Sequence, residues 1–381
     1  MQTLTIDSKL PKAGTTIFTT MSKKASEHKA INLGQGFPDF DADPKLTELA
    51  ANYVMEGKNQ YCPLAGLPKL NKVLCEKIER MYGRKLDPES NICITSGATQ
   101  ALFTAVTAFV NAGDEVIIFE PAYDCYKPEI ILAGGKPVPY TMKYPDYAVD
   151  WSQVEDMVND RTRMIIINSP HNPTGTIFRK SDIEALEHIV KARNIVVLSD
   201  EVYEHLIYDG EEHQSVLRYP HLFEQAMAVF SFGKTLSATG WKLGYIVGPD
   251  RLISEFKAIH QWNVFCANSF LQFTIADYLS DPSHYEYLPG FFQEKRDLMN
   301  ELFADLPLQP VKSKGTYFQL YDYSEVSQSN DGDFAIELIE KYGVASIPVS
   351  PFYTTPPGDK VVRFCFAKKK ETLEKAAEAL Y

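Results

Sequence analysis

The sequence has few of the features that mark several large classes of protein. Its 38 Lys and Arg residues are outnumbered by 50 Asp and Glu, so the formal net charge is −12 and no cationic surplus exists for binding a phosphate backbone. No uninterrupted apolar run reaches the ~18 residues that a membrane span needs, and the first residues lack the basic start and apolar stretch of a secretion signal. We therefore expect no nucleic-acid partner, no membrane insertion and a cytoplasmic location.

Cysteine and histidine motifs are also missing. The six cysteines are scattered without a CxxC pair, and none of the eight histidines belongs to an HExxH motif. Isolated thiols are typical of a reducing compartment rather than of a disulfide-stapled fold. The sequence therefore carries no sign of a metal site, and we expect none.

Length and composition indicate a large globular protein. A chain of 381 residues is long enough for two domains, and 45% hydrophobic with 23% charged residues is an ordinary balance for a compact fold. We expect a large domain over residues 46–280 and a small domain over residues 281–381. The segment 1–45, with the helical pattern TTIFTTMSKKASEHKA, is expected to pack on the small domain or at the interface.

From residue 91 the sequence alternates short β-branched runs with helix-like stretches. Six runs read as strands: NICIT (91–95), EVIIFE (115–120), RMIIIN (163–168), IVVLS (195–199), AVFSF (228–232) and LGYIVG (243–248). The fourth run is followed by DEVYEHL, which has a helical pattern. A long helical pattern then covers residues 250–280. This alternation predicts an α/β fold with a mostly parallel sheet of about seven strands and helices on both faces.

The last hundred residues have a different order of elements. EKRDLMNELFADL and DFAIELIEKYG read as helices, whereas GTYFQLYDY and VVRFCFAK read as strands. A helix-strand-helix-strand order is typical of an α+β module. We therefore expect the small domain to be of this kind.

Polar and aromatic residues follow the predicted strands, where open α/β sheets bind their ligands. Ala98 and Thr99 begin a helix after the first strand, and free N–H groups at a helix start favour a phosphate. Tyr123 follows the second strand, and Asn172 lies in the turn NSPHNPTG after the third. Taken singly, each has an ordinary explanation as a helix cap, a core aromatic or a turn residue.

The next strand ends bring an acid, a phenol, a hydroxyl and two amines. Asp200 and Tyr203 follow the fourth run, Ser231 and Lys234 end the fifth, and Lys242 precedes the sixth. A phosphate cradle, a stacking aromatic, an amide, a carboxylate, a phenol and a lysine together are the parts that pyridoxal 5′-phosphate (PLP) requires. The amine binds the cofactor's aldehyde, and the carboxylate keeps its ring nitrogen protonated.

At this point the chain resembles the PLP-dependent aminotransferases of fold type I, class I/II branch. The resemblance runs through INLGQGFPDF, NQYCPLAGLPKL, TSGATQAL, PAYDCY, NSPHNPTG, SDEVYEH, SFGKTLSATGWKLGY, GTYF and VVRFCFAKK. It covers nearly the whole chain. Within the branch, AGTTIFTTMS and INLGQGFPDFD are most similar to the bacterial methionine aminotransferases.

The resemblance implies a role for each cofactor-binding residue. Lys234 binds PLP covalently and moves the proton at the substrate Cα, Asp200 pairs with the ring nitrogen, and Tyr123 stacks on the ring. Asn172 and Tyr203 hold the phenolic oxygen of the ring. The phosphate contacts would be Ala98, Thr99, Ser231 and Lys242, the last being arginine in many relatives.

The resemblance also implies a substrate site and a partner. Arg363 binds the α-carboxylate of an amino acid or 2-oxo acid, with help from Gly36 and Asn172. The family pattern places Tyr61 and Phe265 in the partner's site, so the chain is expected to form a homodimer with shared sites. The pocket segment Ile17 and Phe18 is apolar and no second arginine is evident, which favours methionine or an aromatic amino acid over aspartate.

Other reactions remain open at this stage. Kynurenine or glutamine transamination and cysteine-conjugate β-lyase activity would use the same fold, lysine and arginine. A catalytically silent regulator on the PLP fold belongs to another class, which usually carries an extra DNA-binding domain, and we expect no room for one in this chain. The segment around Lys234 is not a P-loop, because the first glycine of that motif is replaced by Ala228.

Overall fold

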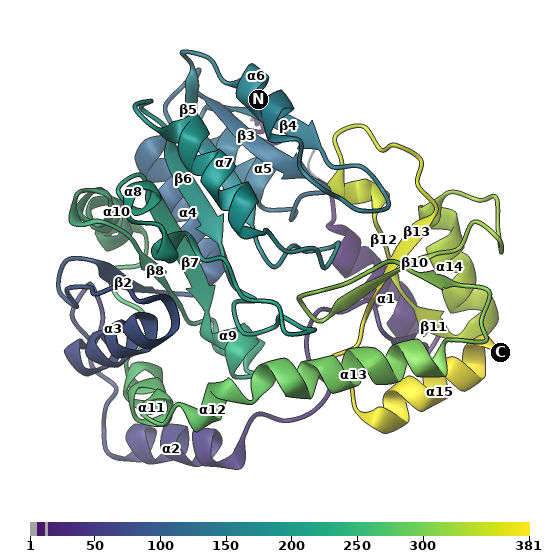
Figure 1. Cartoon of the computed structure of the whole chain (residues 1–381). Coiled ribbons are helices and arrows are strands. Elements are labelled where there is room, and N and C mark those ends of the chain that lie inside the picture. Colours follow the sequence, from purple (N-terminus) through teal and green to yellow (C-terminus); the bar gives the residue numbers. More distant parts are fainter. Residues whose placement is uncertain (1–5, 12–13) are drawn as a thin grey trace, which may run out of the picture.

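The largest sheet of the structure is twisted and has seven strands (Figure 1). The computed structural model describes residues 6–11 and 14–381, so residues 1–5 and 12–13 of the expected N-terminal segment lie outside the described part. The strands stand in the order β2-β8-β7-β6-β5-β3-β4. Their bounds are β2 (Ile92–Thr95), β3 (Glu115–Glu120), β4 (Lys136–Thr141), β5 (Thr162–Asn168), β6 (Val196–Asp200), β7 (Ala226–Ser231) and β8 (Gly244–Val247).

Only β8 runs against the others. It pairs antiparallel with β2 and β7, and every other neighbouring pair is parallel. The expected α/β fold and mostly parallel sheet are thus confirmed. The carboxyl ends of β2, β3, β5, β6 and β7 consequently meet at one edge, which brings the residues that follow these strands together.

Helices cover both faces of this sheet. Alternate strand residues point to opposite sides, so Val116 and Ile118 enter one core cluster while Ile117 enters the other. Because both faces are buried, these strands are almost continuously apolar. One face carries α4 (Ala98–Phe109), α5 (Tyr126–Leu132) and α10 (Asp250–Asn263), and the other carries α6 (Trp151–Met157), α7 (Lys180–Val190) and α8 (Pro220–Phe223).

Strand β4 was not among the predicted runs. Its sequence, KPVPYT, contains two prolines and is mostly half-exposed. Proline lacks the N–H that a central strand must donate on both sides, so it is confined to sheet edges, where β4 lies. This edge strand therefore lacks the apolar run by which the buried strands can be predicted from the sequence.

Two helix predictions were wrong. DEVYEHL forms successive turns rather than a helix, because its buried acids bond to distant groups: Glu204 to Lys77, and Glu201 to the Val216 N–H. The pattern over 250–280 is two helices, α10 and α11 (Ser269–Leu279), separated at Phe265, whose φ is 71°. Tertiary contacts of the acids thus override the helical pattern of DEVYEHL, and the left-handed backbone at Phe265 separates α10 from α11.

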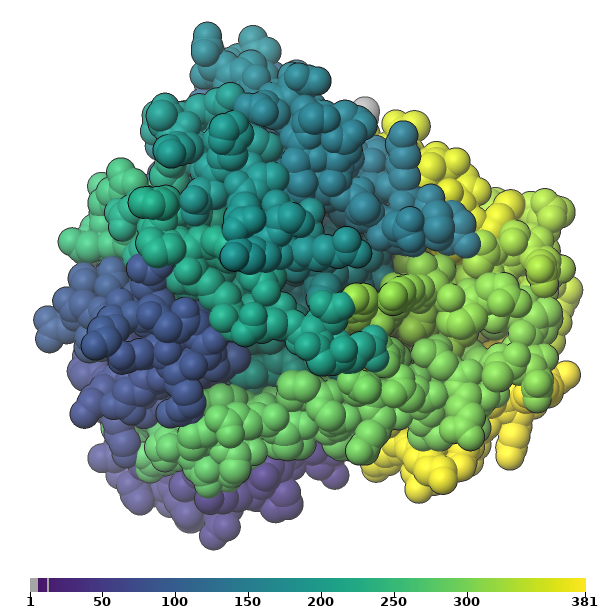
Figure 2. Space-filling model, viewed as in Figure 1, coloured from purple at the N-terminus to yellow at the C-terminus, as the bar shows by residue number. Residues whose placement is uncertain are grey.

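In Figure 2 the light-green and yellow atoms of the C-terminal part lie beside the blue and teal atoms of the preceding part of the chain. An antiparallel sheet has the order β12-β13-β10-β9, and β1 (Ile31–Asn32) pairs with β11 (Val344–Ala345). Helix α1 (Ile17–Glu27) packs against α14, β11 and β12. The other elements are β9 (Gln309–Pro310), β10 (Phe318–Asp322), β12 (Ile347–Pro348), β13 (Val361–Cys365), α13 (Leu288–Leu302), α14 (Asp331–Tyr342) and α15 (Lys370–Leu380).

The division at residues 45 and 280 stays a prediction. Helices α2 (Pro44–Met55) and α3 (Pro68–Tyr82) pack with α11 beside β2, and α13 runs from this side of the molecule to the C-terminal sheet (Figure 1). Within the described ranges, no helix is both long and apolar enough to span a membrane.

A buried ion pair fixes the turn that follows β6. The Lys77 Nζ of α3 donates to Glu204 Oε1 at 2.5 Å and to the Tyr245 hydroxyl at 3.2 Å, and both charged side chains are only 3% exposed. Tyr82 also donates to Glu204. Although burial alone would raise it, these donors hold the pKa of Glu204 at about 2. Helix α3 is thereby tied to the turn that follows Asp200 and carries Tyr203.

We predict that Lys77→Met lowers the free energy of unfolding by about 3–5 kcal/mol, because Glu204 is left as an unpaired buried charge. The double variant Lys77→Met/Glu204→Gln should recover at least half of this loss. Urea unfolding measures both. Lys72→Met, which removes an exposed pair with Glu76, is the control, and a loss for Lys77→Met no larger than the control's would contradict the prediction.

Candidate active site

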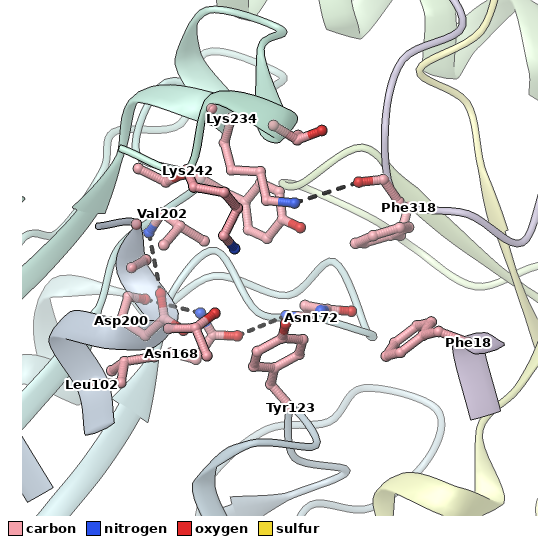
Figure 3. Close-up of a pocket in the computed structure, with 18 of the residues that line it drawn as sticks. Phe18, Leu102, Tyr123, Asn168, Asn172, Asp200, Val202, Lys234, Lys242 and Phe318 are labelled. Atoms are coloured by element: carbon pink, nitrogen blue, oxygen red, sulfur yellow. Dashed lines mark hydrogen bonds between the residues drawn. The ribbon is translucent and has the colours of Figure 1, made fainter. Parts of the chain in front are cut away.

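A cavity of about 310 Å³ opens at the carboxyl edge of the large sheet (Figure 3). Most residues singled out in the sequence line it: Phe18, Gly36, Ala98, Thr99, Tyr123, Asn172, Asp200, Tyr203, Ser231, Lys234, Lys242 and Arg363. Three do not. Ile17 packs, half-buried, against the main core, and Tyr61 and Phe265 lie on the surface with 82% and 50% of their area exposed.

One end of the cavity is formed by the start of α4. Gly97, with φ 86°, lets the chain turn sharply from β2 into the helix, whose first residues are Ala98 and Thr99. The free N–H groups of this first turn and the helix dipole favour an anion. Ser231, at the end of β7, and Lys242 line the same end. Thr99 and Lys242 are both exposed, so this end is open in a single chain.

The amine of Lys234 faces the middle of the cavity from the short helix α9 (Phe232–Thr235). Burial lowers the pKa of Lys234 to about 8, and the charges of Arg363 and Lys242 act in the same direction. The amine therefore loses its proton more readily than an ordinary lysine, and the neutral form is available as a nucleophile or base at lower pH.

Asp200 lies across the cavity at the end of β6. Its Oδ2 accepts a hydrogen bond of 2.5 Å from the Tyr126 hydroxyl, and its Oδ1 accepts one of 3.3 Å from the Val202 N–H. Burial raises the pKa of Asp200 to about 6 against the opposing effect of these donors. The carboxylate is thus still ionised at neutral pH and can pair with a protonated ring nitrogen.

An amide relay connects the strand ends below the cavity. Asn168, at the end of β5, donates through Nδ2 to the Asp200 carbonyl at 2.8 Å, and its Oδ1 accepts from the Asn172 N–H at 2.9 Å. The Asn172 side chain is thereby aimed at the cavity, which Figure 3 shows together with the ring of Tyr123. Burial raises the pKa of Tyr203, which stays a protonated phenol.

Arg363 projects from β13 with no part of its side chain exposed. Its Nη1 donates to Asn172 Oδ1 at 2.7 Å and its Nη2 to the Gly34 carbonyl at 3.1 Å, while Nε has no hydrogen-bond partner among the described residues. The guanidinium lies 3.8 Å from the centroid of the Phe318 ring. Burial lowers the pKa of Arg363 only to about 10, so it stays charged. In the part of the chain that the structure describes, no carboxylate forms an ion pair with this cation.

Sequence reasoning missed several groups at this site. Tyr317 and Phe318 belong to the quoted segment GTYF, and Tyr126 ends PAYDCY, but no spacing rule marks them. Tyr126 hydrogen-bonds Asp200, which is 74 residues away in the sequence, and Tyr317 hydrogen-bonds Lys234, which is 83 residues away. Only the folded sheet brings such pairs together.

The charges of the side chains that line the cavity match those of PLP and an amino acid substrate. Three cationic side chains, Lys234, Lys242 and Arg363, face a single carboxylate, Asp200. A phosphate at α4 and a substrate carboxylate at the orphaned Arg363 N–H would balance them. An amine of lowered pKa and a carboxylate across the cavity match the aldehyde and ring nitrogen of the cofactor. The fold and cavity together define a PLP-dependent enzyme of the transferase type.

Comparison with known proteins specifies the family. The model of the family Aminotransferase class I and II matches residues 28–380, and the chain belongs to this family. Methionine aminotransferase of Escherichia coli (strain K12) is 46% identical over 374 residues, which is 98% of this chain and 97% of that protein. Human kynurenine–oxoglutarate transaminase 1 is 34% identical over 94% of this chain and 93% of its own length.

A solved structure agrees along the whole chain. An Escherichia coli protein described as having a methionine aminotransferase function superposes with a TM-score of 0.97 at 45% identity, with 99% of both chains covered. The chain is thus a PLP-dependent aminotransferase.

We predict that Tyr126→Phe lowers kcat/KM about tenfold or more and weakens PLP binding, because the Asp200 carboxylate loses a hydrogen bond worth roughly 1.5–3 kcal/mol. Steady-state kinetics and a PLP titration of the apoprotein measure the two effects. Tyr144→Phe is the matched control, since it removes a phenol–carboxylate bond of 2.6 Å to Asp322 outside the cavity. Equal behaviour of the two variants would refute a special role for Tyr126.

Proposed function

We propose that the enzyme transfers the amino group of methionine, and also of aromatic amino acids, to a 2-oxo acid by a ping-pong mechanism. The observation that carries this proposal is the apolar surrounding of Arg363, whose guanidinium lies between Phe18 and Phe318, at 5.2 and 3.8 Å from the ring centroids. Among the described lining residues, no second arginine is present for a side-chain carboxylate. The Escherichia coli relative named for methionine supports the same donor.

The kynurenine transaminases among the relatives support the aromatic part of the proposal. Phe18, Tyr123 and Phe318 provide aromatic surface that can contact either a thioether or a ring. Aromatic donors, kynurenine included, are therefore a second candidate substrate class.

In this mechanism Lys234 is the base at the reacting carbon. Arg363, assisted by Gly36 and Asn172, binds the α-carboxylate and thereby sets the Cα–H bond toward the Lys234 amine. The neutral amine takes the proton from Cα and later returns it. PLP, when bound, supplies the electron sink for the pair left behind.

The other predicted residues hold the cofactor. With PLP bound, Asp200 would keep the ring nitrogen protonated, and Asn172 and Tyr203 would hydrogen-bond the phenolic oxygen. Tyr123 would stack on the ring. Ala98, Thr99, Ser231 and Lys242 bind the phosphate, where the α4 N-terminus adds its dipole.

We also propose a homodimer in which Tyr61 and Phe265 complete the partner's site. Their ring centroids are 5.2 Å apart, so they form an aromatic pair on the surface of one chain, and Trp262, three residues before Phe265 in the sequence, is 84% exposed. Large exposed aromatics of this kind are typical of interfaces. The open phosphate end at Thr99 and Lys242 supports the same arrangement. All six cysteines are free, which supports a cytoplasmic location.

We predict that kcat/KM for methionine exceeds that for aspartate by at least about 100-fold, because burying an unpaired carboxylate costs several kcal/mol. Phenylalanine and kynurenine should fall between them. Arg363→Lys should raise KM for every donor alike without changing their order. Comparable rates for aspartate and methionine would contradict the proposed substrate class, and pyruvate release from a cysteine conjugate as the main reaction would favour the β-lyase.

A second prediction concerns the shared site. Lys234→Ala should be inactive and Tyr61→Ala weakly active, but mixing the two after subunit exchange should raise activity above their sum. The mixed dimer holds one site with both Lys234 and the partner's Tyr61. Light scattering during the exchange reports the oligomeric state, and no gain on mixing would mean that Tyr61 does not serve the neighbour.

A further inference from the structure

The amine of Lys234 has a partner that the mechanism above does not use. Its Nζ donates a hydrogen bond of 2.9 Å to the Tyr317 hydroxyl, and it lies 3.4 Å from the Gly36 carbonyl oxygen. The Tyr317 hydroxyl in turn donates to the same Gly36 carbonyl. These three groups form a closed triangle on the side of the cavity nearest the C-terminal sheet.

The direction of these bonds decides what Tyr317 can do. Because the phenol proton is engaged by the Gly36 carbonyl, the phenol oxygen acts only as an acceptor toward Lys234. The amine therefore donates one N–H to Tyr317 and keeps its lone pair free. A partner that donated to Lys234 would block that lone pair.

Tyr317 is also a neutral partner. No part of it is exposed, and burial raises its pKa well above the usual value, so it remains protonated. A carboxylate at this position would hold Lys234 as an ammonium, whereas a phenol oxygen stabilises the ammonium only moderately. The amine can consequently be either free or protonated, as a base that takes and returns a proton must be.

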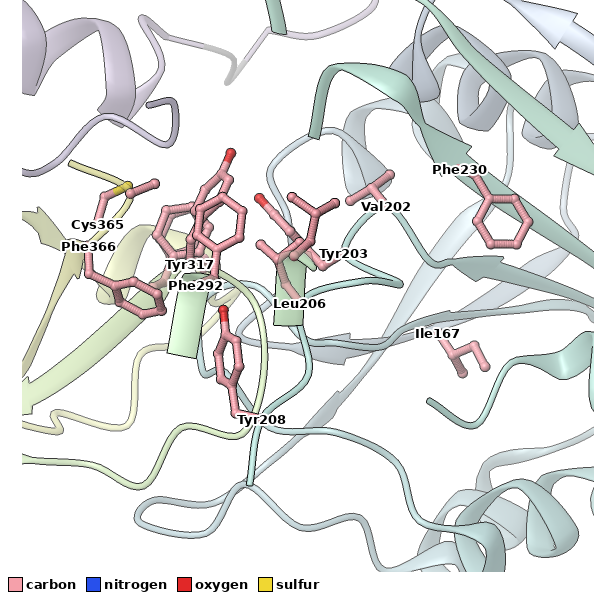
Figure 4. Packing of buried hydrophobic residues seen from close by; sticks show 14 of the residues in the cluster. Ile167, Val202, Tyr203, Leu206, Tyr208, Phe230, Phe292, Tyr317, Cys365 and Phe366 are labelled. Carbon is pink, nitrogen blue, oxygen red and sulfur yellow. The ribbon is translucent and has the colours of Figure 1, made fainter. Parts of the chain in front are cut away.

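The position of Tyr317 depends on a strained backbone conformation at the residue before it. The preceding Thr316 has φ 66°, a left-handed conformation that a β-branched residue rarely adopts. Three hydrogen bonds hold it there: Thr316 N–H to the Leu206 carbonyl at 3.0 Å, the Phe318 N–H to Thr316 Oγ1 at 3.0 Å, and the Tyr208 hydroxyl to the Thr316 carbonyl. Figure 4 shows the Tyr317 ring between Tyr203 on the sheet side and Phe366 on the other.

The Gly36 carbonyl is held equally firmly. A Cβ at Gly36 would lie 2.8 Å from the Phe318 ring, so any other residue there would displace that ring. On either side of it, the Gly34 carbonyl accepts from Arg363 at 3.1 Å and the Phe37 carbonyl from Lys368 at 2.8 Å. The acceptor for the phenol proton is thus a fixed part of the cavity.

We propose that Tyr317 is a further catalytic residue, which orients the Lys234 amine through its phenol oxygen and stabilises the ammonium formed when that amine takes the substrate Cα proton. In this step the Cα–H bond breaks, its proton forms a new N–H bond at Nζ, and the electron pair stays on the carbon side. The ammonium then donates to both Tyr317 and the Gly36 carbonyl. This inference rests on the proposed role of Lys234 as the base.

The first test uses the apoprotein, with PLP itself as the probe. Only the neutral amine attacks the aldehyde, so the rate of covalent attachment should rise with pH and level off above about 8, the pKa to which burial lowers Lys234. Tyr317→Phe removes an acceptor that favours the ammonium. The midpoint should therefore move down by about half a pH unit or more.

The second test follows the loaded enzyme in a single half-reaction with methionine. Tyr317→Phe should slow it about tenfold with KM little changed, and the isotope effect with Cα-deuterated methionine should rise, because proton transfer becomes more limiting. Tyr321→Phe is the matched control, since it removes a phenol that donates to Asn300 at 2.7 Å away from the cavity.

The outcomes separate this proposal from the one on which it rests. If Lys234→Ala is inactive but Tyr317→Phe matches Tyr321→Phe in both midpoint and isotope effect, the role of Tyr317 is refuted and the transaminase stands. If Lys234→Ala retains activity, the base assignment itself fails. Should Tyr317→Phe not fold, 3-fluorotyrosine placed at position 317 provides a weaker acceptor of nearly the same shape. It must then lower the midpoint pH of PLP attachment relative to the unmodified protein, and an unchanged midpoint would overturn the proposal.

Discussion

Asp200 and Arg363 must remain ionised where protein, rather than water, surrounds them, and much of the molecule serves that requirement. Burial moves the pKa of Asp200 up to about 6 and that of Arg363 down to about 10, yet both stay charged at neutral pH. Each is kept so by neutral partners, a phenol for Asp200 and an amide and a carbonyl for Arg363. Neutral partners leave the charge available to a ligand, whereas an ion pair would consume it.

The layer behind the cavity follows a different rule. Lys77 and Glu204 pair directly, and Glu201 accepts from His213 at 2.8 Å and from the Val216 N–H at 3.1 Å. These acids stand next to Asp200 and Tyr203 in the sequence SDEVYEH. Neighbouring residues of this segment thus face opposite ways. Asp200 and Tyr203 line the cavity and form no ion pair there with any described residue, whereas Glu201 and Glu204 point into the protein and bind to partners within it. Rigidity of the turn comes from the second set and chemistry from the first.

The sequence predicted the central strands because a strand buried on both faces must be almost wholly apolar, as EVIIFE shows. It predicted Lys234, Asp200 and Arg363 because strand ends converge and the motifs resemble a known family. It did not reveal β4, whose prolines suit only an edge, nor the turns of DEVYEHL, whose acids bond to Lys77 and Val216. Tyr126 and Tyr317 were missed for a related reason, since the role of a phenol depends on which distant group it meets.

The cavity collects its walls from almost the full length of the chain, from Phe18 to Arg363. The groups proposed to hold the cofactor lie between Gly97 and Leu243, whereas Arg363, proposed to bind the substrate carboxylate, stands only a short way before the C-terminal helix α15. During synthesis on the ribosome the sheet and its lysine therefore emerge well before the arginine. The residues proposed to hold the cofactor are thus synthesised before Arg363, and the substrate site, which also takes Phe18 and Gly36 from the start of the chain, can close only when both ends have been made.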